Sequence, residues 1–128
     1  MCGIFGYVGY ITKERAVKCL DLLEHRGPDG SGIWQDTDVT LGHRRLSILD
    51  ISENGAQPMS FAEERFWITF NGEVYNFLEL REDLEKRGYR FKTDTDTEVV
   101  LGSYIEWGSD CLAKFNGMWS LAIWDSAD

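Results

Sequence analysis

The sequence predicts an α+β protein built of stacked sheets and helices, and three observations carry this prediction. Strand-like and helix-like segments come in mixed order along the chain, which favours a layered α+β sandwich over a doubly wound parallel sheet. A hydrophobic fraction of 43% is enough to build a core. The 128 residues fit one domain, spanning 1–128, and contain neither an internal repeat nor a low-complexity linker.

The first half of the chain contains one predicted helix between predicted strands. Apolar side chains recur at helical spacing over residues 13–25, and Thr12 is placed to cap this helix. Pro28 and three glycines in HRGPDGSG then predict a loop. Runs of apolar and β-branched residues predict strands over residues 4–8, 33–35 and 40–49.

The second half begins with ISENGAQPMS, residues 51–60, which is rich in turn-forming residues and predicts a loop. One helix is predicted over residues 78–87 with Gly88 as its stop, and another from a cap at Thr95 or Thr97. The run MWSLAIW is apolar throughout and predicts a strand covered on both faces. The strands predicted in this half span residues 66–70, ending at Asn71-Gly72, then 89–92 and 118–124.

Charge and cysteine content exclude several classes of function. The formal net charge is -9 and no run of Lys or Arg exists, so a nucleic-acid partner is not expected. The three cysteines are widely spaced without a C-x-x-C pair, which favours neither a disulfide framework nor a zinc site. No segment resembles a signal peptide or a membrane span, so a cytoplasmic protein without a membrane partner is expected.

Cys2 is the first residue with nucleophilic chemistry. It follows only Met1, and removal of Met1 would leave cysteine at the N-terminus. A terminal α-amine, with an ordinary pKa of about 7.7–8.0, can accept the proton of its own thiol. A cysteine can also stand at position 2 by chance, so its significance depends on the rest of the pattern.

Six ordered segments resemble the motifs of the class II glutamine amidotransferases. They are MCGIFGYVG, HRGPDGSG, LGHRRLSI, FNGEVYNF, TDTDTEVVL and FNGMWSLAIWD, and they extend over essentially the whole chain. Within that superfamily, RGPD, HRRLSI and NGEVYN are most similar to the asparagine synthetase branch. The resemblance implies a four-layer αββα sandwich of the N-terminal-nucleophile type. It also implies attack of the Cys2 thiolate on the side-chain amide of L-glutamine, release of ammonia and hydrolysis of a glutamyl thioester.

The resemblance assigns an oxyanion hole to Asn71 and Gly72, through the asparagine side chain and the glycine N–H. Asn-Gly after a strand is also a common tight turn, and both interpretations can hold together. Arg45 matches the residue that binds the α-carboxylate of glutamine, for which a forked guanidinium is suited. Its neighbour Arg44 lies on the same predicted strand and is expected to point to the opposite face.

Glu73 and Asp96 match the positions that bind the α-ammonium group of glutamine. The alternation of Asp94, Asp96 and Glu98 could also suggest calcium, but Val99 stands where an EF-hand loop requires glycine. No metal site is therefore expected. A helix start is the ordinary alternative for part of this acidic cluster.

Arg26 and Asp29 lie in the HRGPDG loop, and by resemblance they support the nucleophile end of the chain. A plain turn with a surface ion pair would explain the same residues equally well. The remaining candidate bases and nucleophiles are interpreted as structural side chains, with histidines as hydrogen-bonding groups and cysteines as buried, inert thiols: His25, His43, Cys19 and Cys111.

Beyond residue 128 the resemblance implies further strands and a synthetase domain, so the sandwich is expected to be C-terminally incomplete. ATP and Mg²⁺ would belong to that synthetase domain, and no cofactor is expected in this chain. A synthetase domain or subunit would accept the ammonia, although the acceptor is not identified by the sequence. An unpaired sheet edge would favour a homo-oligomer or marginal stability.

The sequence is compatible with two other functions. The chain could be a catalytically silent truncated fragment that acts as a binding or interaction module. It could also be an N-terminal-cysteine hydrolase of a different amide, although one arginine with two carboxylates suits a free amino acid better.

Overall fold

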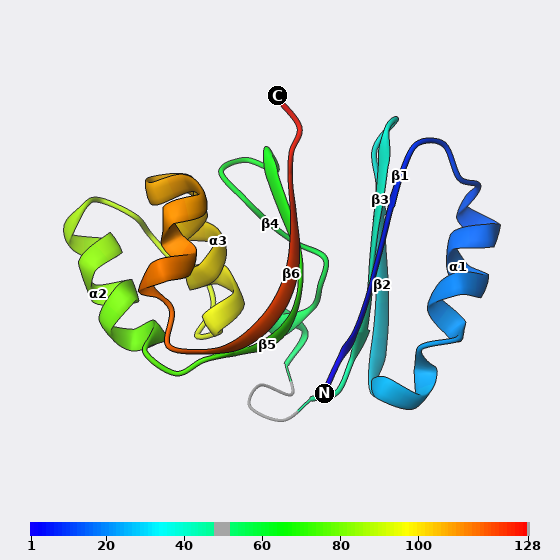
Figure 1. Cartoon of the computed structure of the whole chain (residues 1–128), viewed down its shortest axis with the longest axis horizontal. Helices are drawn as coiled ribbons and strands as arrows, with labels where there is room; N and C mark the ends of the chain where they lie inside the picture. Colours follow the sequence, from blue (N-terminus) through cyan, green and yellow to red (C-terminus); the bar gives the residue numbers. More distant parts are fainter. Residues whose placement is uncertain (48–51, 128) are drawn as a thin grey trace.

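The computed structural model describes residues 1–47 and 52–127, and it shows two antiparallel sheets packed face to face between helices (Figure 1). The first sheet has the order β1-β3-β2, and the second has the order β4-β5-β6. The strands of the first sheet are β1 (Gly3–Val8), β2 (Gly30–Gln35) and β3 (Val39–Arg45). Those of the second are β4 (Met59–Phe61), β5 (Phe66–Val74) and β6 (Gly117–Asp125).

Helices cover the outer faces of both sheets and complete the four layers. Helix α1 (Lys13–Asp21) covers the first sheet, whereas α2 (Phe77–Lys86) and α3 (Asp96–Trp107) cover the second (Figure 1). Short 3₁₀ segments connect these elements: η1 (Glu24–Arg26), η2 (Glu53–Gly55) and η3 (Gly108–Lys114). The predicted αββα sandwich is therefore confirmed.

Caps predicted from the sequence begin and end these helices. The hydroxyl of Thr12 accepts a hydrogen bond from the N–H of Arg15 at the start of α1. Thr95, and not Thr97, caps α3 by accepting from the N–H of Glu98. Gly88 follows α2 with a φ of 99°, the left-handed conformation in which glycine ends helices.

The main hydrophobic core lies between the second sheet and helices α2 and α3. Ile68 of β5, Leu84 of α2 and Leu101 of α3 are all 0% exposed. Helix α3 is buried around most of its circumference from Thr97 to Ser103, which places it at the centre of this layer. Burial of one such side chain contributes about 1.5–3 kcal/mol, so this layer holds β5 firmly in place.

The two sheets are joined by stacked aromatic rings and by hydrogen bonds. Trp34 of β2 and Trp67 of β5 stack with ring centroids 4.6 Å apart. The hydroxyl of Thr69 donates to the carbonyl of Gly42 at 2.9 Å. The buried ring of His43 on β3 donates from Nε2 to the carbonyl of Phe70 on β5 at 3.2 Å. These bonds fix how β5 lies against β3.

The inter-sheet histidine makes stability depend on pH. The pKa of His43 is lowered from 6.5 to about 4, mainly by burial; the bond to Phe70 opposes this shift and the charge of Arg45 adds to it. Between these pH values the unfolded chain binds a proton that the folded chain does not. We therefore expect His43 to contribute about 3 kcal/mol that is fully present above pH 6.5 and lost as the pH falls towards 4.

The measurement is urea unfolding of the wild type and of His43→Gln between pH 4 and 7. Other groups, among them Asp96 with its raised pKa, contribute equally to both proteins and cancel in the difference. The stability difference between the two proteins should change across this range. A difference that is independent of pH would show that the ring titrates normally.

The largest departure from the sequence prediction concerns Asn71-Gly72. The tight turn predicted there is wrong, because β5 continues to Val74 and pairs with β6 along its whole length, Asn71 opposite Ser120 and Gly72 opposite Trp119. Pairing over nine residues outweighs the local turn preference of the dipeptide.

Four other segments also differ from their predictions. Residues 89–92 form no strand, because Glu98 takes the N–H group of Lys92 that a ladder would need. The predicted loop at 51–60 ends in β4, and the first helix stops at Asp21. Strand β6 is the outer strand of its sheet and is not covered on both faces, with Met118 61% exposed. Of the strand predicted over 40–49, residues 48–49 lie outside the described residues.

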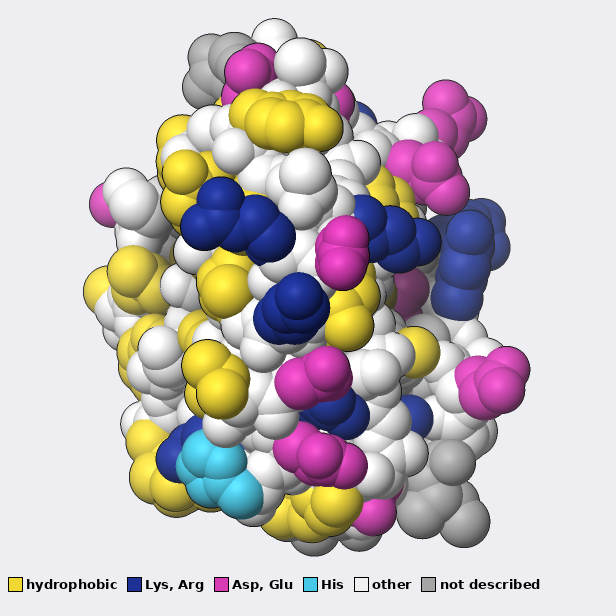
Figure 2. Space-filling model, turned by 90° about the vertical axis from the view of Figure 1, so that its right-hand side faces the viewer, with side chains coloured by type: hydrophobic (Ala, Val, Ile, Leu, Met, Phe, Trp, Pro, Cys, Tyr) yellow, Lys and Arg dark blue, Asp and Glu magenta, His cyan; other side chains and the backbone are white. Residues whose placement is uncertain are grey.

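The face of the molecule over α1 carries charges of both signs. Figure 2 shows Lys and Arg side chains interspersed with Asp and Glu on this face. Within α1 itself, Lys18 pairs with Glu14 at 3.8 Å, and both side chains are exposed. Such mixed charge is typical of a solvated surface.

Candidate active site

Cys2 lies immediately before β1, where the pairing of Gly3 with Arg44 brings it beside the segment that follows β3. The N–H of Leu46 donates to the Cys2 sulfur at 3.4 Å, and the thiol lies 3.8 Å from the Leu46 carbonyl. Arg26 donates from Nε to the Cys2 carbonyl at 3.0 Å. Residue 2 is therefore held through both its sulfur and its carbonyl.

Asp29 supports the same region from the HRGPDG loop. Its N–H donates to the Arg45 carbonyl at 3.0 Å, and its carboxylate accepts from the N–H of Ser47 at 2.8 Å. A Cβ atom on Gly27 would lie 2.4 Å from the carbonyl of Arg44, so the loop can pack this closely only with glycine there. Arg26 therefore contacts residue 2, and Asp29 contacts the segment at the end of β3, in bonds beyond those of a plain surface turn.

One cavity of about 860 Å³ brings the other predicted site residues together with Cys2. It opens between the start of β1, the end of β3, the second half of β5 and the start of α3. All six residues predicted for catalysis or substrate binding line it: Cys2, Arg45, Asn71, Gly72, Glu73 and Asp96.

The floor of the cavity is an edge of β5 that β4 leaves open. Strand β4 pairs with β5 only as far as Met59 opposite Ile68. Further along, side chains take the N–H groups on this edge: Gln57 accepts from Phe70 at 2.6 Å, and Asp96 accepts from Val74 at 3.0 Å. Alternate residues of an antiparallel strand direct their N–H groups to the same edge. The N–H of Gly72 therefore points into the cavity between these two bonds.

Only glycine fits at position 72, because the backbone of β6 lies close to it. A Cβ atom there would lie 2.3 Å from the carbonyl oxygen of Met118 and 2.6 Å from the Cα of Trp119 on β6. Any side chain would push β6 away from β5. Asn71 and Glu73, on either side, point to the opposite face of the strand from Phe70, towards the first sheet and Cys2.

The two neighbouring arginines point in opposite directions, as the strand pattern predicts. Arg44 donates from Nε to the Leu20 carbonyl at 3.3 Å and pairs with Asp21, on the α1 side. Arg45 lines the cavity and donates to the Ser52 carbonyl at 2.6 Å. This arrangement gives the cavity one guanidinium group from β3.

Two carboxylates, those of Glu73 on β5 and Asp96 on α3, line the same cavity as this guanidinium. Burial raises the pKa of Asp96, and the negative charge of Glu73 raises it too, whereas the N–H groups of Val74 and Thr97 lower it. A cation between the two carboxylates would offset both their burial and their mutual repulsion. The cavity can therefore hold a zwitterion with its anionic end at Arg45 and its cationic end at Glu73 and Asp96.

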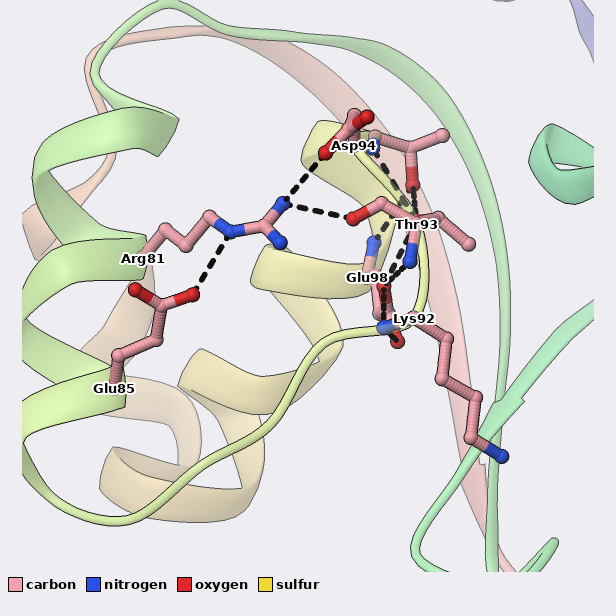
Figure 3. A network of polar contacts seen from close by, with 7 residues as sticks. Arg81, Glu85, Lys92, Thr93, Asp94 and Glu98 are labelled. Atoms are coloured by element: carbon pink, nitrogen blue, oxygen red, sulfur yellow. Dashed lines mark hydrogen bonds and ion pairs between the residues drawn. The ribbon is translucent and has the colours of Figure 1, made fainter.

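The other acidic residues of TDTDTE serve different purposes (Figure 3). Asp94 is exposed and pairs with Arg81 at 3.6 Å. Glu98 is buried and accepts hydrogen bonds from the N–H of Lys92 at 2.9 Å and from the N–H and hydroxyl of Thr93. In the part of the chain that the structure describes, no three His, Cys, Asp or Glu side chains converge as metal ligands would.

Glu98 holds the loop at residues 92–95, which lines the cavity. We expect Glu98→Ala to lower the free energy of unfolding by about 3 kcal/mol, because two partly buried N–H groups lose their charged acceptor. Asp94→Ala is the matched control, since its exposed ion pair contributes at most about 1 kcal/mol. Chemical denaturation of both variants measures the difference, and equal stabilities would refute this role of Glu98.

Several groups that contact the predicted residues were not recognisable from the sequence. Leu46 contacts the Cys2 sulfur through its backbone, which no side-chain pattern reveals. Gln57 stands in a turn-rich segment, where a lone glutamine carries no signal of a role. His43 is buried and hydrogen-bonded, in agreement with its structural interpretation, and His25 is exposed on η1.

Both thiols outside the cavity are free cysteines, and their environments differ. Cys111 is 1% exposed, and burial together with the charge of Asp110 raises its pKa. Cys19 on α1 is only half-buried, so its prediction as a buried thiol is wrong.

The sequence model of the glutamine amidotransferase domain matches residues 1–128. The chain belongs to this domain family. Asparagine synthetase (glutamine-hydrolysing) 1 of Bacillus subtilis is 44% identical to this chain. The match covers 100% of this chain and 21% of the length of that protein. Asparagine synthetase B (glutamine-hydrolysing) of Escherichia coli is 39% identical over 98% of this chain and 23% of its own length.

The chain spans less than a quarter of the length of these two relatives. A solved structure of glutamine phosphoribosylpyrophosphate amidotransferase from B. subtilis superposes with a TM-score of 0.79 at 20% identity. The match covers 96% of this chain and 35% of that one. This likeness shows that the two share the N-terminal-nucleophile amidotransferase fold. Within residues 1–47 and 52–127, none of the helices combines the length and the apolar character that a membrane crossing needs.

Proposed function

We propose that this amidotransferase domain hydrolyses L-glutamine to L-glutamate and ammonia, with Cys2 as the nucleophile once Met1 has been removed. The observation that carries the proposal is the single cavity in which the Cys2 thiol, the inward N–H of Gly72 and charged groups of both signs meet. Met1 is 68% exposed, which makes it accessible to an aminopeptidase. Its removal would convert the Cys2 amide nitrogen into a free amine.

That α-amine is the proposed base. It takes the proton of the Cys2 thiol, and the sulfur attacks the side-chain amide carbon of glutamine. The carbonyl oxygen becomes an oxyanion, for which the N–H of Gly72 and the side chain of Asn71 are the proposed donors. The C–N bond then breaks as the ammonium of Cys2 returns its proton to the leaving nitrogen, which departs as ammonia.

Hydrolysis of the resulting thioester restores the enzyme. The Cys2 amine takes a proton from water, the hydroxide oxygen attacks the thioester carbon, and the C–S bond breaks. The sulfur is reprotonated and glutamate leaves. The same oxyanion donors serve both steps, since both pass through a tetrahedral intermediate on the same carbon.

Recognition of a free amino acid follows from the charges of the cavity. Arg45 would bind the α-carboxylate as a fork, and Glu73 with Asp96 would bind the α-ammonium. Clamping both ends places the amide of a substrate of glutamine length at a set distance from the sulfur. A peptide glutamine lacks these two charges and would be excluded.

The fate of the ammonia is proposed from the relatives. Their names describe glutamine-hydrolysing asparagine synthetases, so we propose a synthetase domain or subunit as the ammonia acceptor. ATP and Mg²⁺ are proposed to act there, whereas the hydrolysis of glutamine by Cys2 needs no cofactor. A cytoplasmic location, and a homo-oligomer formed through an outer sheet edge, belong to the same proposal.

The test combines intact mass, labelling and product formation. Active protein is expected to lack the mass of Met1, to release ammonia from glutamine but not from asparagine, and to be labelled at Cys2 by a chloroketone analogue of glutamine. Excess glutamate should protect against the label. Active protein that retains Met1, or a label elsewhere, would refute the proposed mechanism. Absence of ammonia release would favour the silent binding module.

A further inference from the structure

Gln57 lies at the junction of three parts of the fold and is one of the residues that line the cavity. Its side-chain oxygen accepts from the N–H of Phe70 on β5 at 2.6 Å. Its side-chain nitrogen donates to the hydroxyl of Thr97 on α3 at 3.3 Å. A Cβ atom on Gly32 of β2 would lie 2.1 Å from the Gln57 carbonyl, so its backbone rests directly on the first sheet.

The bond to Phe70 takes the place of a backbone hydrogen bond that β4 does not supply. Gln57 stands two residues before Met59, and Phe70 stands two residues after Met59's partner Ile68. The side chain of Gln57 therefore bonds where backbone pairing would otherwise continue. The carbonyl of Phe70 is held by His43 from the first sheet. The backbone N–H and carbonyl of Phe70, the residue before Asn71, are thus both held by side chains.

The bond to Thr97 acts on the other wall of the cavity. Thr97 follows Asp96 in the first turn of α3, and Asp96 itself accepts from the N–H of Val74. In addition to their apolar packing, strand β5 and helix α3 are linked by hydrogen bonds at two places, directly at Val74 and through Gln57 at Phe70. Gly72 lies between these two links.

We propose that Gln57 is a positioning residue that sets the distance between the oxyanion donors on β5 and the ammonium-binding carboxylate on α3. The inference rests on the proposed glutamine hydrolysis. Without Gln57, hydrogen bonds would join β5 and α3 on only one side of Gly72. The amide carbon of glutamine, clamped at Asp96, would then no longer meet the N–H of Gly72 in register.

Kinetics of three variants test this role. Gln57→Leu removes both bonds at similar volume, and we expect kcat/KM for glutamine to fall about 10²-fold, mainly in kcat. Thr97→Val removes only the link to α3 and is expected to raise KM several-fold with a smaller change in kcat. Gln57→Glu restores an acceptor for Phe70 and should recover part of kcat.

Gln35→Leu is the matched control. Gln35 also makes two hydrogen bonds, to the Ile11 carbonyl and the Thr40 hydroxyl, but it lies away from the active-site cavity. Its kcat/KM should stay within about twofold of the wild type. Alkylation of Cys2 by iodoacetamide does not depend on the groups that bind the charged ends of glutamine. It should therefore be equally fast in all variants. Unchanged kcat/KM in folded Gln57→Leu, or a matching loss of alkylation, would overturn the inference.

Amide exchange separates this inference from the proposed function. If the wild type releases no ammonia, the proposed function fails, but the effect of Gln57 on the position of β5 can still be measured by NMR. Gln57→Leu should then speed exchange at Phe70 at least tenfold while exchange at Ile68 stays unchanged. Equal exchange at Phe70 in both proteins would show that Gln57 does not hold β5.

Discussion

Replacing Cys2 by alanine is expected to abolish ammonia release from glutamine, with kcat falling by about 10⁶-fold, as when a serine hydrolase loses its nucleophile. The sulfur is the only atom proposed to form a covalent bond to the substrate. Alanine retains the α-amine, the contact of Arg26 with the residue 2 carbonyl, and the clamp for both charged ends of glutamine. We therefore expect binding to persist while turnover disappears, measured as glutamate release and as glutamine binding by calorimetry.

Cys19→Ala controls for the loss of a thiol. Cys19 is half-buried on α1, on the outer face of the first sheet, and is not among the cavity-lining residues. This variant should keep the wild-type kcat, with at most a modest loss of stability. Residual turnover in Cys2→Ala above about 1% of the wild type would show that another group attacks the amide.

Replacing Asn71 by alanine is expected to lower kcat by about 10²–10³-fold, or about 2.7–4 kcal/mol of transition-state stabilisation. The oxyanion exists only after the sulfur has attacked, so a donor to it lowers the barrier without strengthening substrate binding. KM should therefore change little. The position on β5 supports this reading, because the strand runs straight through residue 71 and directs its side chain towards Cys2.

Asn76→Ala provides a control of the same residue type. The side chain of Asn76 donates to the Lys114 carbonyl and accepts from the N–H of Asn116, and it is not among the residues lining the cavity. Its loss should lower the unfolding temperature but keep kcat within about twofold. If Asn71→Ala raised KM and left kcat unchanged, Asn71 would bind the ground state and Gly72 would be left as the proposed oxyanion donor.

Local chemistry made much of the fold predictable. The caps Thr12 and Thr95, the glycine stop after α2 and the strands of the first sheet are short-range features, readable within a few residues. The motifs also indicated six candidate residues for catalysis and substrate binding, and the structure brings those six residues to one cavity. Predictions failed where a distant partner outweighed local preference, as at Asn71-Gly72, where β6 extends β5 through a turn-forming dipeptide.

The amino-acid pattern alone established that a cysteine next to the start of the chain accompanies an arginine and paired carboxylates suited to a free amino acid. It could not establish how those groups meet, because hydrogen bonds between distant segments leave no periodicity in a sequence. Where β4 stops, which N–H groups Gln57 and Asp96 occupy, and where the N–H of Gly72 therefore points are consequences of packing two sheets and three helices together. Short sequence motifs identify the candidate catalytic and binding residues, whereas the packing of the whole fold sets the distances between them.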